Sequence, residues 1–196
     1  MAQSRQDERI DMLRLSREQC HDHLYLTRKQ HFDKIVIGAA IIRLATAPDS
    51  ELDEPHILLL KRNADEIYYP NVFEMPGGKV DLEDLSIRDA LSREVKEETG
   101  LDLTHVLSQL PDMTYSTEKT IQRENRTEQL IKKSCIQLNF AIMVDYTHGT
   151  IFRVNPSEHS TGIWASRRVL GELEMTEQMR ELVLVALEQS RNFPTP

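Results

Sequence analysis

A sharply bounded helix behind a glycine turn is the feature that most restricts how this 196-residue chain folds. Met75-Pro-Gly-Gly-Lys79 predicts a turn in which the backbone approaches its neighbours closely. Ser86 and Asp89 form a helix-capping pair, and Gly100 is placed to end a helix in a left-handed turn. We therefore predict a helix from about Ser86 to Thr99 that begins soon after the turn.

The end of this predicted helix carries three glutamates. At roughly 100° per residue, Glu94, Glu97 and Glu98 fall within an arc of about 100° and share one face. Carboxylates this close repel one another, and near a helix C-terminus they also oppose the helix dipole. A solvated acidic face balanced by nearby cations is the plainer interpretation; a bound cation is the alternative with chemical consequences.

Hard divalent cations meet this need, because Mg²⁺ and Mn²⁺ prefer oxygen ligands and bridge carboxylates to phosphate oxygens. Such a site would polarise a diphosphate and position an attacking water, and Glu97 or Glu98 would accept the proton of that water. The glycine turn before the helix favours this interpretation, since its backbone can approach a metal or a phosphate.

The segment from Gly78 to Leu101 resembles the Nudix box: Gly, five residues, Glu, seven residues, then Arg-Glu-apolar-any-Glu-Glu-any-Gly-apolar. Arg93-Glu-Val-Lys-Glu-Glu-Thr-Gly-Leu101 matches its second half at every specified position. The first half departs, because Asp84 stands where the family has Glu and eight residues separate it from Arg93. We interpret this as an insertion of one residue in the loop, with the role of Asp84 or Glu83 left open.

The resemblance implies roles for individual residues. Glu94 and Glu98 are the expected metal ligands, Glu97 is a further ligand or the base, and Arg93 would bond one of the glutamates. The carbonyl of Gly77 is an additional ligand by similarity, and Gly78 would lie near the substrate. The expected cofactor is Mg²⁺ or Mn²⁺.

Further substrate-binding candidates flank the box. Arg62 ends a predicted strand and would contact a phosphate or pair with a nearby acid such as Asp65 or Glu66. Phe73 and Glu74 precede the glycine turn, where Phe73 is either a core residue or a stacking platform. Glu158 would be an auxiliary ligand or base, or an exposed loop carboxylate; with His159 and Trp164 it resembles the loop before the last Nudix helix.

The remaining pattern predicts an α/β protein, a Nudix-type α/β/α sandwich with a mixed sheet and an N-terminal helical extension. We expect residues 1–33 to form the extension, packed on the core and helical from Ser4 to about Lys29, and residues 34–196 to form the Nudix hydrolase domain. Apolar runs predict strands at 34–44, 56–62 and 135–145, a strand within 71–80 leads into the glycine turn, and residues 116–133 read as a long hairpin or loop. A capped apolar stripe predicts a helix over 175–189.

The composition of the chain limits the classes of partner that it is expected to bind. A net charge of −8 disfavours nucleic acid polymers, and no apolar run approaches the roughly 20 residues that span a membrane. The polar start predicts a cytoplasmic protein, and Cys20 and Cys135 are too few for a disulfide framework. A homodimer is left open.

The leading hypothesis is a metal-dependent hydrolase that cleaves a diphosphate bond in a nucleoside diphosphate linked to another moiety. Two alternatives remain. One is a hydrolase of a non-nucleotide diphosphate, such as a prenyl diphosphate or a diphosphoinositol. The other is a non-catalytic Nudix-fold module that binds a nucleotide. The loops at 111–135 and 146–163 are where specificity is expected.

Overall fold

The computed structural model describes residues 11–44, 54–122, 128–144 and 151–193. In chain order, the helices and strands are η1 (Met12–Arg14), α2 (Arg17–Arg28), β1 (Lys34–Arg43), β2 (His56–Arg62), β3 (Phe73–Glu74), α3 (Ile87–Thr99), β4 (Leu103–Gln109), β5 (Met113–Gln122), β6 (Glu128–Val144), β7 (His159–Ser166), η2 (Leu170–Glu172), α4 (Glu177–Gln189) and η3 (Ser190–Asn192). No helix among these residues is long and apolar enough to cross a membrane.

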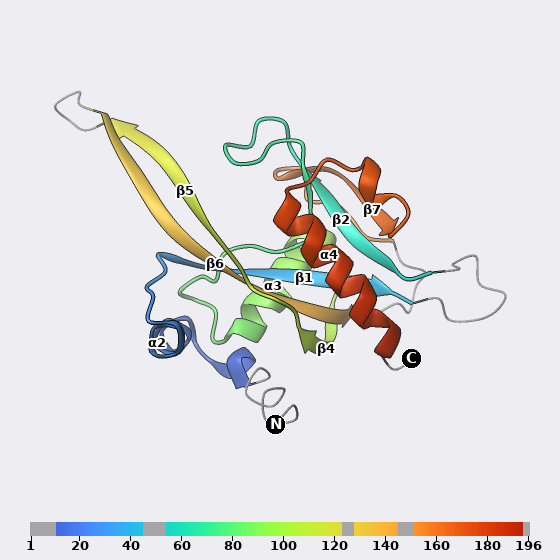
Figure 1. The fold of residues 1–196 in the computed structure, drawn as a ribbon, viewed down its shortest axis with the longest axis horizontal. Helices are drawn as coiled ribbons and strands as arrows, with labels where there is room; N and C mark the ends of the chain where they lie inside the picture. Colours follow the sequence, from blue (N-terminus) through green and yellow to red (C-terminus); the bar gives the residue numbers. More distant parts are fainter. Residues whose placement is uncertain (1–10, 45–53, 123–127, 145–150, 194–196) are drawn as a thin grey trace.

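The strands form one mixed sheet in the order β3-β2-β1-β6-β4, with β7 paired to β2 and β5 paired to β6. The β1 and β6 strands run parallel from Lys34↔Cys135 to Ile41↔Ile142, and all other named pairs are antiparallel. The long strand β6 pairs with β4 along one part and with β5 along the other, and the β5–β6 hairpin extends away from the body of the protein (Figure 1).

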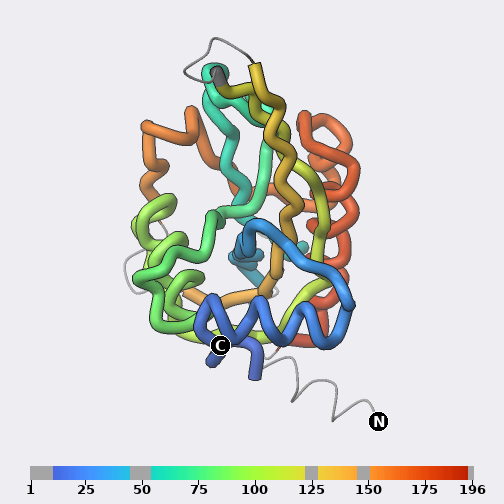
Figure 2. Tube along the Cα trace, turned by 90° about the vertical axis from the view of Figure 1, so that its left-hand side faces the viewer, coloured from blue at the N-terminus to red at the C-terminus, as the bar shows by residue number. Residues whose placement is uncertain are grey.

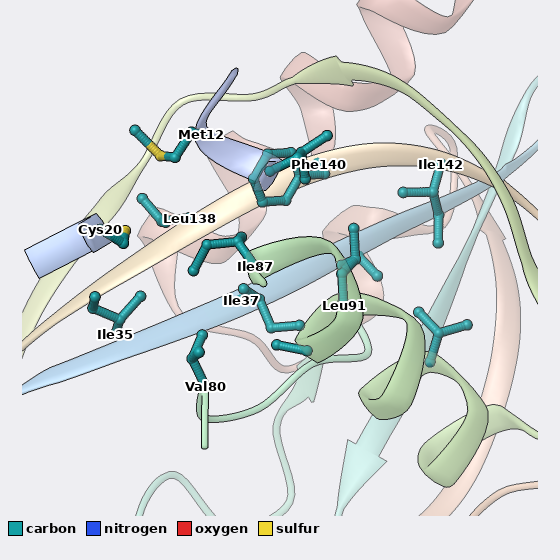
Figure 3. Close-up of a cluster of buried hydrophobic side chains, with 14 of the residues drawn as sticks. Met12, Cys20, Ile35, Ile37, Val80, Ile87, Leu91, Leu138, Phe140 and Ile142 are labelled. Carbon is teal, nitrogen blue, oxygen red and sulfur yellow. The ribbon is translucent and has the colours of Figure 1, made fainter. Parts of the chain in front are cut away.

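Two helices cover opposite faces of the sheet, with α3 on one side and α4 on the other (Figure 2). The α3 side holds the larger cluster of buried side chains, to which η1, α2, β1, β2, α3 and β6 contribute (Figure 3). The apolar stripe of α4 packs on the other face against residues such as Ala40, Ile57 and Leu59. This arrangement is the α/β/α sandwich with a mixed sheet that the sequence predicts.

The N-terminal helix α2 packs against the α3 side of the sheet. Its inner residues Cys20 and Leu24 are almost fully buried in the same cluster as Ile35 and Leu138. Residues 4–10 of the predicted extension lie outside the described residues. The boundary between residues 33 and 34 remains a prediction, because the two parts share one apolar cluster.

Helix capping agrees with the sequence patterns. The Ser86 side chain accepts a hydrogen bond from the Asp89 N–H, Gly100 ends α3 with a φ of 71°, and the Thr176 side chain caps α4. Each cap satisfies backbone groups that the helix itself leaves unpaired.

Three segments differ from the predicted pattern. The strand expected within 71–80 is only two residues long, because residues 76–80 leave β2 and follow β1 instead. Strand β7 occupies residues 159–166, where a loop was expected, and β4 was not predicted. By contrast, the segment at 116–133, expected to be a long hairpin or loop, does belong to a hairpin, of which residues 123–127 lie outside the described part.

Candidate functional site

The glycine turn lies directly against β1. The N–H of Ile37 donates to Gly78 O at 2.8 Å, and the N–H of Ala39 donates to Pro76 O at 2.7 Å. Gly77 has a φ of 153°, and a Cβ on this residue would lie 2.1 Å from Ile37 O. Only glycine fits this approach, so the turn is fixed relative to the sheet.

The last two turns of α3 bring two glutamates to this turn. Glu98 Oε2 accepts a hydrogen bond from the N–H of Gly77 at 2.8 Å. A Cβ on Gly78 would lie 2.5 Å from the carboxyl group of Glu94. Glu98 is only 3% exposed and Glu94 is also buried, whereas the side chain of Glu97 is 55% exposed. The shared face predicted for the three residues is therefore divided into a buried pair and an exposed third.

Arg93 connects these carboxylates to the lengthened loop. Its Nε and Nη2 each donate to one oxygen of Asp84, both at 2.9 Å. Its Nη1 donates to Glu94 at 2.8 Å and to Glu97 at 3.1 Å. Asp84 also accepts from the N–H of Asp81 at 2.8 Å. Asp84, and not Glu83, thus makes the paired contact that holds the loop on α3.

Burial makes the ionised form of the inner carboxylates unfavourable. It raises the pKa of Glu98 to about 9, against the stabilising hydrogen bond from Gly77, and repulsion from Glu74, Glu94 and Glu158 raises it further. Burial also raises the pKa of Glu94, although Arg93 opposes this change. The metal-free site therefore favours the protonated form of Glu98, and a bound cation would favour its ionised form.

A second set of polar side chains lies behind Glu98. His159 is buried, its Nε2 is 3.3 Å from Glu74 Oε1, and its Nδ1 is 3.9 Å from Glu98 Oε1. That Nδ1 atom has no hydrogen-bond partner in the described structure. Arg62 donates to Glu74 and to Glu66, both at 2.7 Å. The sequence left open whether Arg62 contacts a phosphate or pairs with a nearby acid, and in the structure it pairs with acids.

A cavity of about 290 Å³ opens beside this turn. Its lining includes the predicted site residues Arg62, Phe73, Glu74, Gly77, Gly78, Glu98 and Glu158. Arg93, Glu94 and Glu97 are not part of the lining. Phe73 is largely buried in the α4-side cluster, with Lys61 Nζ 5.7 Å from its ring centroid, and Glu158 is exposed at the cavity.

Across the described residues, no three His, Cys, Asp or Glu side chains gather closely enough to form a metal cage on their own. Arg93 holds Glu94 and Glu97 instead. The donor set nevertheless suits a hard cation, because Glu94 and Glu98 are buried, mutually repelling oxygen donors beside a backbone turn that only glycine can form.

Several lining residues escaped the sequence-based prediction. The hairpin strands contribute Met113, Tyr115, Thr117 and Gln137, and the loop after β2 contributes Tyr68 and Tyr69. Period-two alternation of Met113, Tyr115 and Thr117 was the available signal, but it identifies a shared strand face and not a cavity. His159 was noted only beside Glu158, without a role of its own.

Comparison with known families decides the classification. The family model described as NUDIX domain matches residues 39–185. The chain belongs to the Nudix family. No match was found among curated proteins.

Solved Nudix structures share this fold at low sequence identity. The NUDIX domain of Shewanella oneidensis NrtR, complexed with ADP ribose, has a TM-score of 0.54 and 14% identity and covers 87% of this chain and 97% of its own. The MutT NUDIX hydrolase from Burkholderia pseudomallei has a TM-score of 0.52 and 22% identity, with 78% and 96% coverage. A C. elegans Ap4A hydrolase has a TM-score of 0.51 and 16% identity, with 82% and 99% coverage. These similarities establish the Nudix fold of the chain.

Proposed function

We propose that this Nudix protein is a metal-dependent hydrolase that cleaves a diphosphate bond in a nucleoside diphosphate linked to another moiety. The observation that carries the proposal is the placement of Glu94 and Glu98. Both carboxyl groups are buried against the glycine turn, and Glu98 lines the cavity. Burial and mutual repulsion of these two carboxylates lower the stability of the folded protein. A bound cation would offset this loss, so the arrangement is typical of a cation-binding site.

Glu94 and Glu98 would hold Mg²⁺ or Mn²⁺, with the Gly77 carbonyl as a further ligand. The bound cation would supply polarisation of the diphosphate and compensation of the charge that develops as the bond breaks. Arg93 keeps Glu94 oriented through its Asp84 anchor. Glu97, whose exposed carboxylate is the easiest of the three to reach from solvent, would accept the proton of the attacking water.

Two lining residues would complete the diphosphate end of the cavity. Gly78 lines the cavity and has the Glu94 carboxyl group directly beside its backbone, so a phosphate oxygen bound at Gly78 would lie close to the proposed ligand Glu94. Glu158 is an auxiliary ligand or base in this proposal, since its charge acts on both Glu94 and Glu98. Arg62 would act indirectly, because its ion pairs orient Glu74 and Glu66.

The test is a hydrolysis screen with Mg²⁺ or Mn²⁺ that separates and detects the phosphorylated products, because cleavage within most of these diphosphates releases no inorganic phosphate. The panel contains nucleoside triphosphates, nucleotide sugars, ADP-ribose, dinucleoside polyphosphates, prenyl diphosphates and diphosphoinositols. Glu98→Gln should lower turnover at least about 100-fold, the scale of losing one catalytic charge. Glu181→Gln makes the same chemical change on the exposed surface of α4 and serves as the matched control.

Turnover of a nucleotide class that disappears in Glu98→Gln and persists in Glu181→Gln would support the proposal. Turnover that Glu98→Gln leaves unchanged would remove Glu98 from the reaction. Absence of turnover across the panel, together with a nucleotide that raises the melting temperature, would identify the chain as a binding module.

A further inference from the structure

The floor of the cavity is one half of a sheet face. Side chains of Lys34 and Val36 on β1 lie beside those of Cys135 and Gln137 on β6, in the register of the parallel pair. Met113, Tyr115 and Thr117 on β5 continue the same floor. Helix α4 packs on the other half of this face, around Ala40, Ile42 and Ala141. The floor therefore comes from the base of the β5–β6 hairpin and the start of β1.

Gln137 in this floor and Asn139 behind it have buried amide side chains, and the orientation of both amides follows from their contacts. The Nδ2 of Asn139 donates to the carbonyl oxygens of Pro111 at 2.9 Å and of Gln137 at 3.2 Å. Carbonyl oxygens only accept, so this atom must be the nitrogen of Asn139. Its Oδ1 consequently accepts from Gln137 Nε2, at 2.8 Å.

The same chain of contacts fixes the amide of Gln137. The amide nitrogen of Gln137 donates to Asn139, so the amide oxygen Oε1 points elsewhere. No described residue donates a hydrogen bond to this oxygen. Gln137 is 8% exposed and lines the cavity, while Asn139 is fully buried and does not line it. Gln137 thus presents a hydrogen-bond acceptor of fixed orientation, and Asn139 holds it from behind.

Gly38 on β1 makes room for this amide pair. A Cβ at that position would lie 2.4 Å from Asn139 Oδ1 and 2.6 Å from Gln137 Nε2. Any side chain there would displace both amides. The arrangement consequently depends on three positions on two neighbouring strands.

The other residues that line the cavity limit which class of substrate can bind next to the Gln137 oxygen. Tyr115, Met113 and Met179 give this part of the cavity apolar surface. A prenyl tail would leave the Gln137 oxygen without a hydrogen-bond donor, which is unfavourable for a buried polar group. A diphosphoinositol needs several cations, but Arg62 and Lys79 are paired with acids, and Lys34 is the one lining cation without an ion-pair partner among the described residues.

We infer that Gln137, oriented by Asn139, is a specificity-determining residue that accepts a hydrogen bond from the exocyclic amino group of a nucleobase. This inference rests on the proposed function, because it assigns the organic part of that substrate to the hairpin end of the cavity. Adenine, cytosine and guanine each carry an exocyclic amino group that donates hydrogen bonds at the edge of the base. A site built around such a contact rejects the analogue that lacks it, since its own polar group is then left unpaired.

The test measures nucleotide binding without turnover, by calorimetry of the full chain in EDTA. The probes are three pairs of 5′-monophosphates that differ in one amino group: adenosine and purine riboside, guanosine and inosine, cytidine and 2-pyrimidinone riboside. For the pair that binds most tightly, removing the amino group should weaken wild-type binding about tenfold, the factor that corresponds to one such hydrogen bond.

Gln137→Met should reduce this ratio of affinities to near one, and Asn139→Ala should lower it although Asn139 touches no ligand. Loss of structure alone would weaken both members of a pair equally, so the ratio separates a positioning role from a structural one. Gln109→Met is the matched control and should keep the ratio, because Gln109 lies on β4 outside the cavity lining. If Gln137→Met fails to fold, Gly38→Ala displaces the same amide pair.

A ratio that stays at its wild-type value in Gln137→Met, or in Gly38→Ala, would overturn the inference. So would failure of all three pairs to bind. Neither result depends on hydrolysis, and metal-dependent hydrolysis that requires Glu98 would then still support the proposed function with a different organic group.

Discussion

Replacing Glu98 by Gln should stabilise the metal-free protein at neutral pH, even though the same change removes a proposed metal ligand. Glu98 is 3% exposed and its pKa lies at about 9, whereas an unperturbed Glu titrates at 4.5. Between these values the folded chain retains a proton that the unfolded chain has released. The free energy of unfolding therefore falls as the pH rises through this window. A glutamine has no such dependence, and its amide oxygen can still accept the Gly77 N–H.

The size of the effect follows from the pKa difference. At pH 7 the medium is about 2.5 pH units above the unperturbed pKa, and each unit corresponds to about 1.36 kcal/mol. Glu98→Gln should thus gain about 3 kcal/mol over wild type at pH 7 and less than about 1 kcal/mol at pH 5. For a chain of this length, the gain at pH 7 corresponds to about 6–12 °C in melting temperature.

Urea unfolding in EDTA at pH 5 and pH 7 measures this difference, with Glu181→Gln as the control for a carboxylate-to-amide change on the surface. Adding Mg²⁺ or Mn²⁺ at pH 7 should then stabilise wild type more than Glu98→Gln, because cation binding requires the ionised carboxylate. The reasoning fails if Glu98→Gln is no more stable than wild type at pH 7 in EDTA. That result would mean that the folded protein already ionises Glu98 without a cation.

Three further changes test the surroundings of the site. Asp84→Ala removes the paired contact with Arg93 and should cost about 2 kcal/mol in urea unfolding, as expected for hydrogen bonds to a charged group. Because Arg93 lowers the pKa of Asp84, that stabilisation should be present above its usual pKa and fade as the pH falls; equal acid sensitivity of variant and wild type would contradict this. Gly78→Ala places a Cβ 2.5 Å from the Glu94 carboxyl group, so Mn²⁺ should no longer raise the melting temperature; an unchanged Mn²⁺ shift would exclude Glu94 as a ligand. Ser86→Ala removes the N-cap of α3 and should cost about 1 kcal/mol with little change in turnover, and a loss much larger than this would assign the serine another role.

The elements that the sequence predicted well are those with a local signal. Strands β1 and β2 are continuous apolar runs, and α3 and α4 carry caps and apolar stripes, so their bounds fall within one or two residues of the prediction. Strand β4 is half exposed and lacks clean alternation, and β7 combines small and polar residues, so neither has a pattern that separates it from a loop. The pairing of both with central strands is a tertiary contact that no local pattern reports.

In the candidate site, too, some residues had a local sequence signal and others depend on tertiary contacts. Helical geometry brought Glu94, Glu97 and Glu98 together, and the family resemblance added Arg93 and the glycine turn. The exposure of Glu97 depends on how α3 lies on the sheet, and the pairing of Arg62 depends on a neighbouring loop. Gln137 and Tyr115 required knowledge of which strands adjoin β6 and which half of that face α4 leaves open. The chemistry of the site was therefore predictable in part, and the shape of its ligand space was not.

The extra residue in the loop between Gly78 and Arg93 has a consequence for how the Nudix box is recognised. What the structure maintains there is a pair of contacts, in which Asp84 returns to Arg93 and the glycine turn follows β1. A shorter acidic side chain combined with one more backbone residue reaches the same guanidinium as a longer side chain on a shorter loop would. Patterns that fix the number of residues would reject such chains. A criterion that asks for an acid able to reach the arginine would retain them.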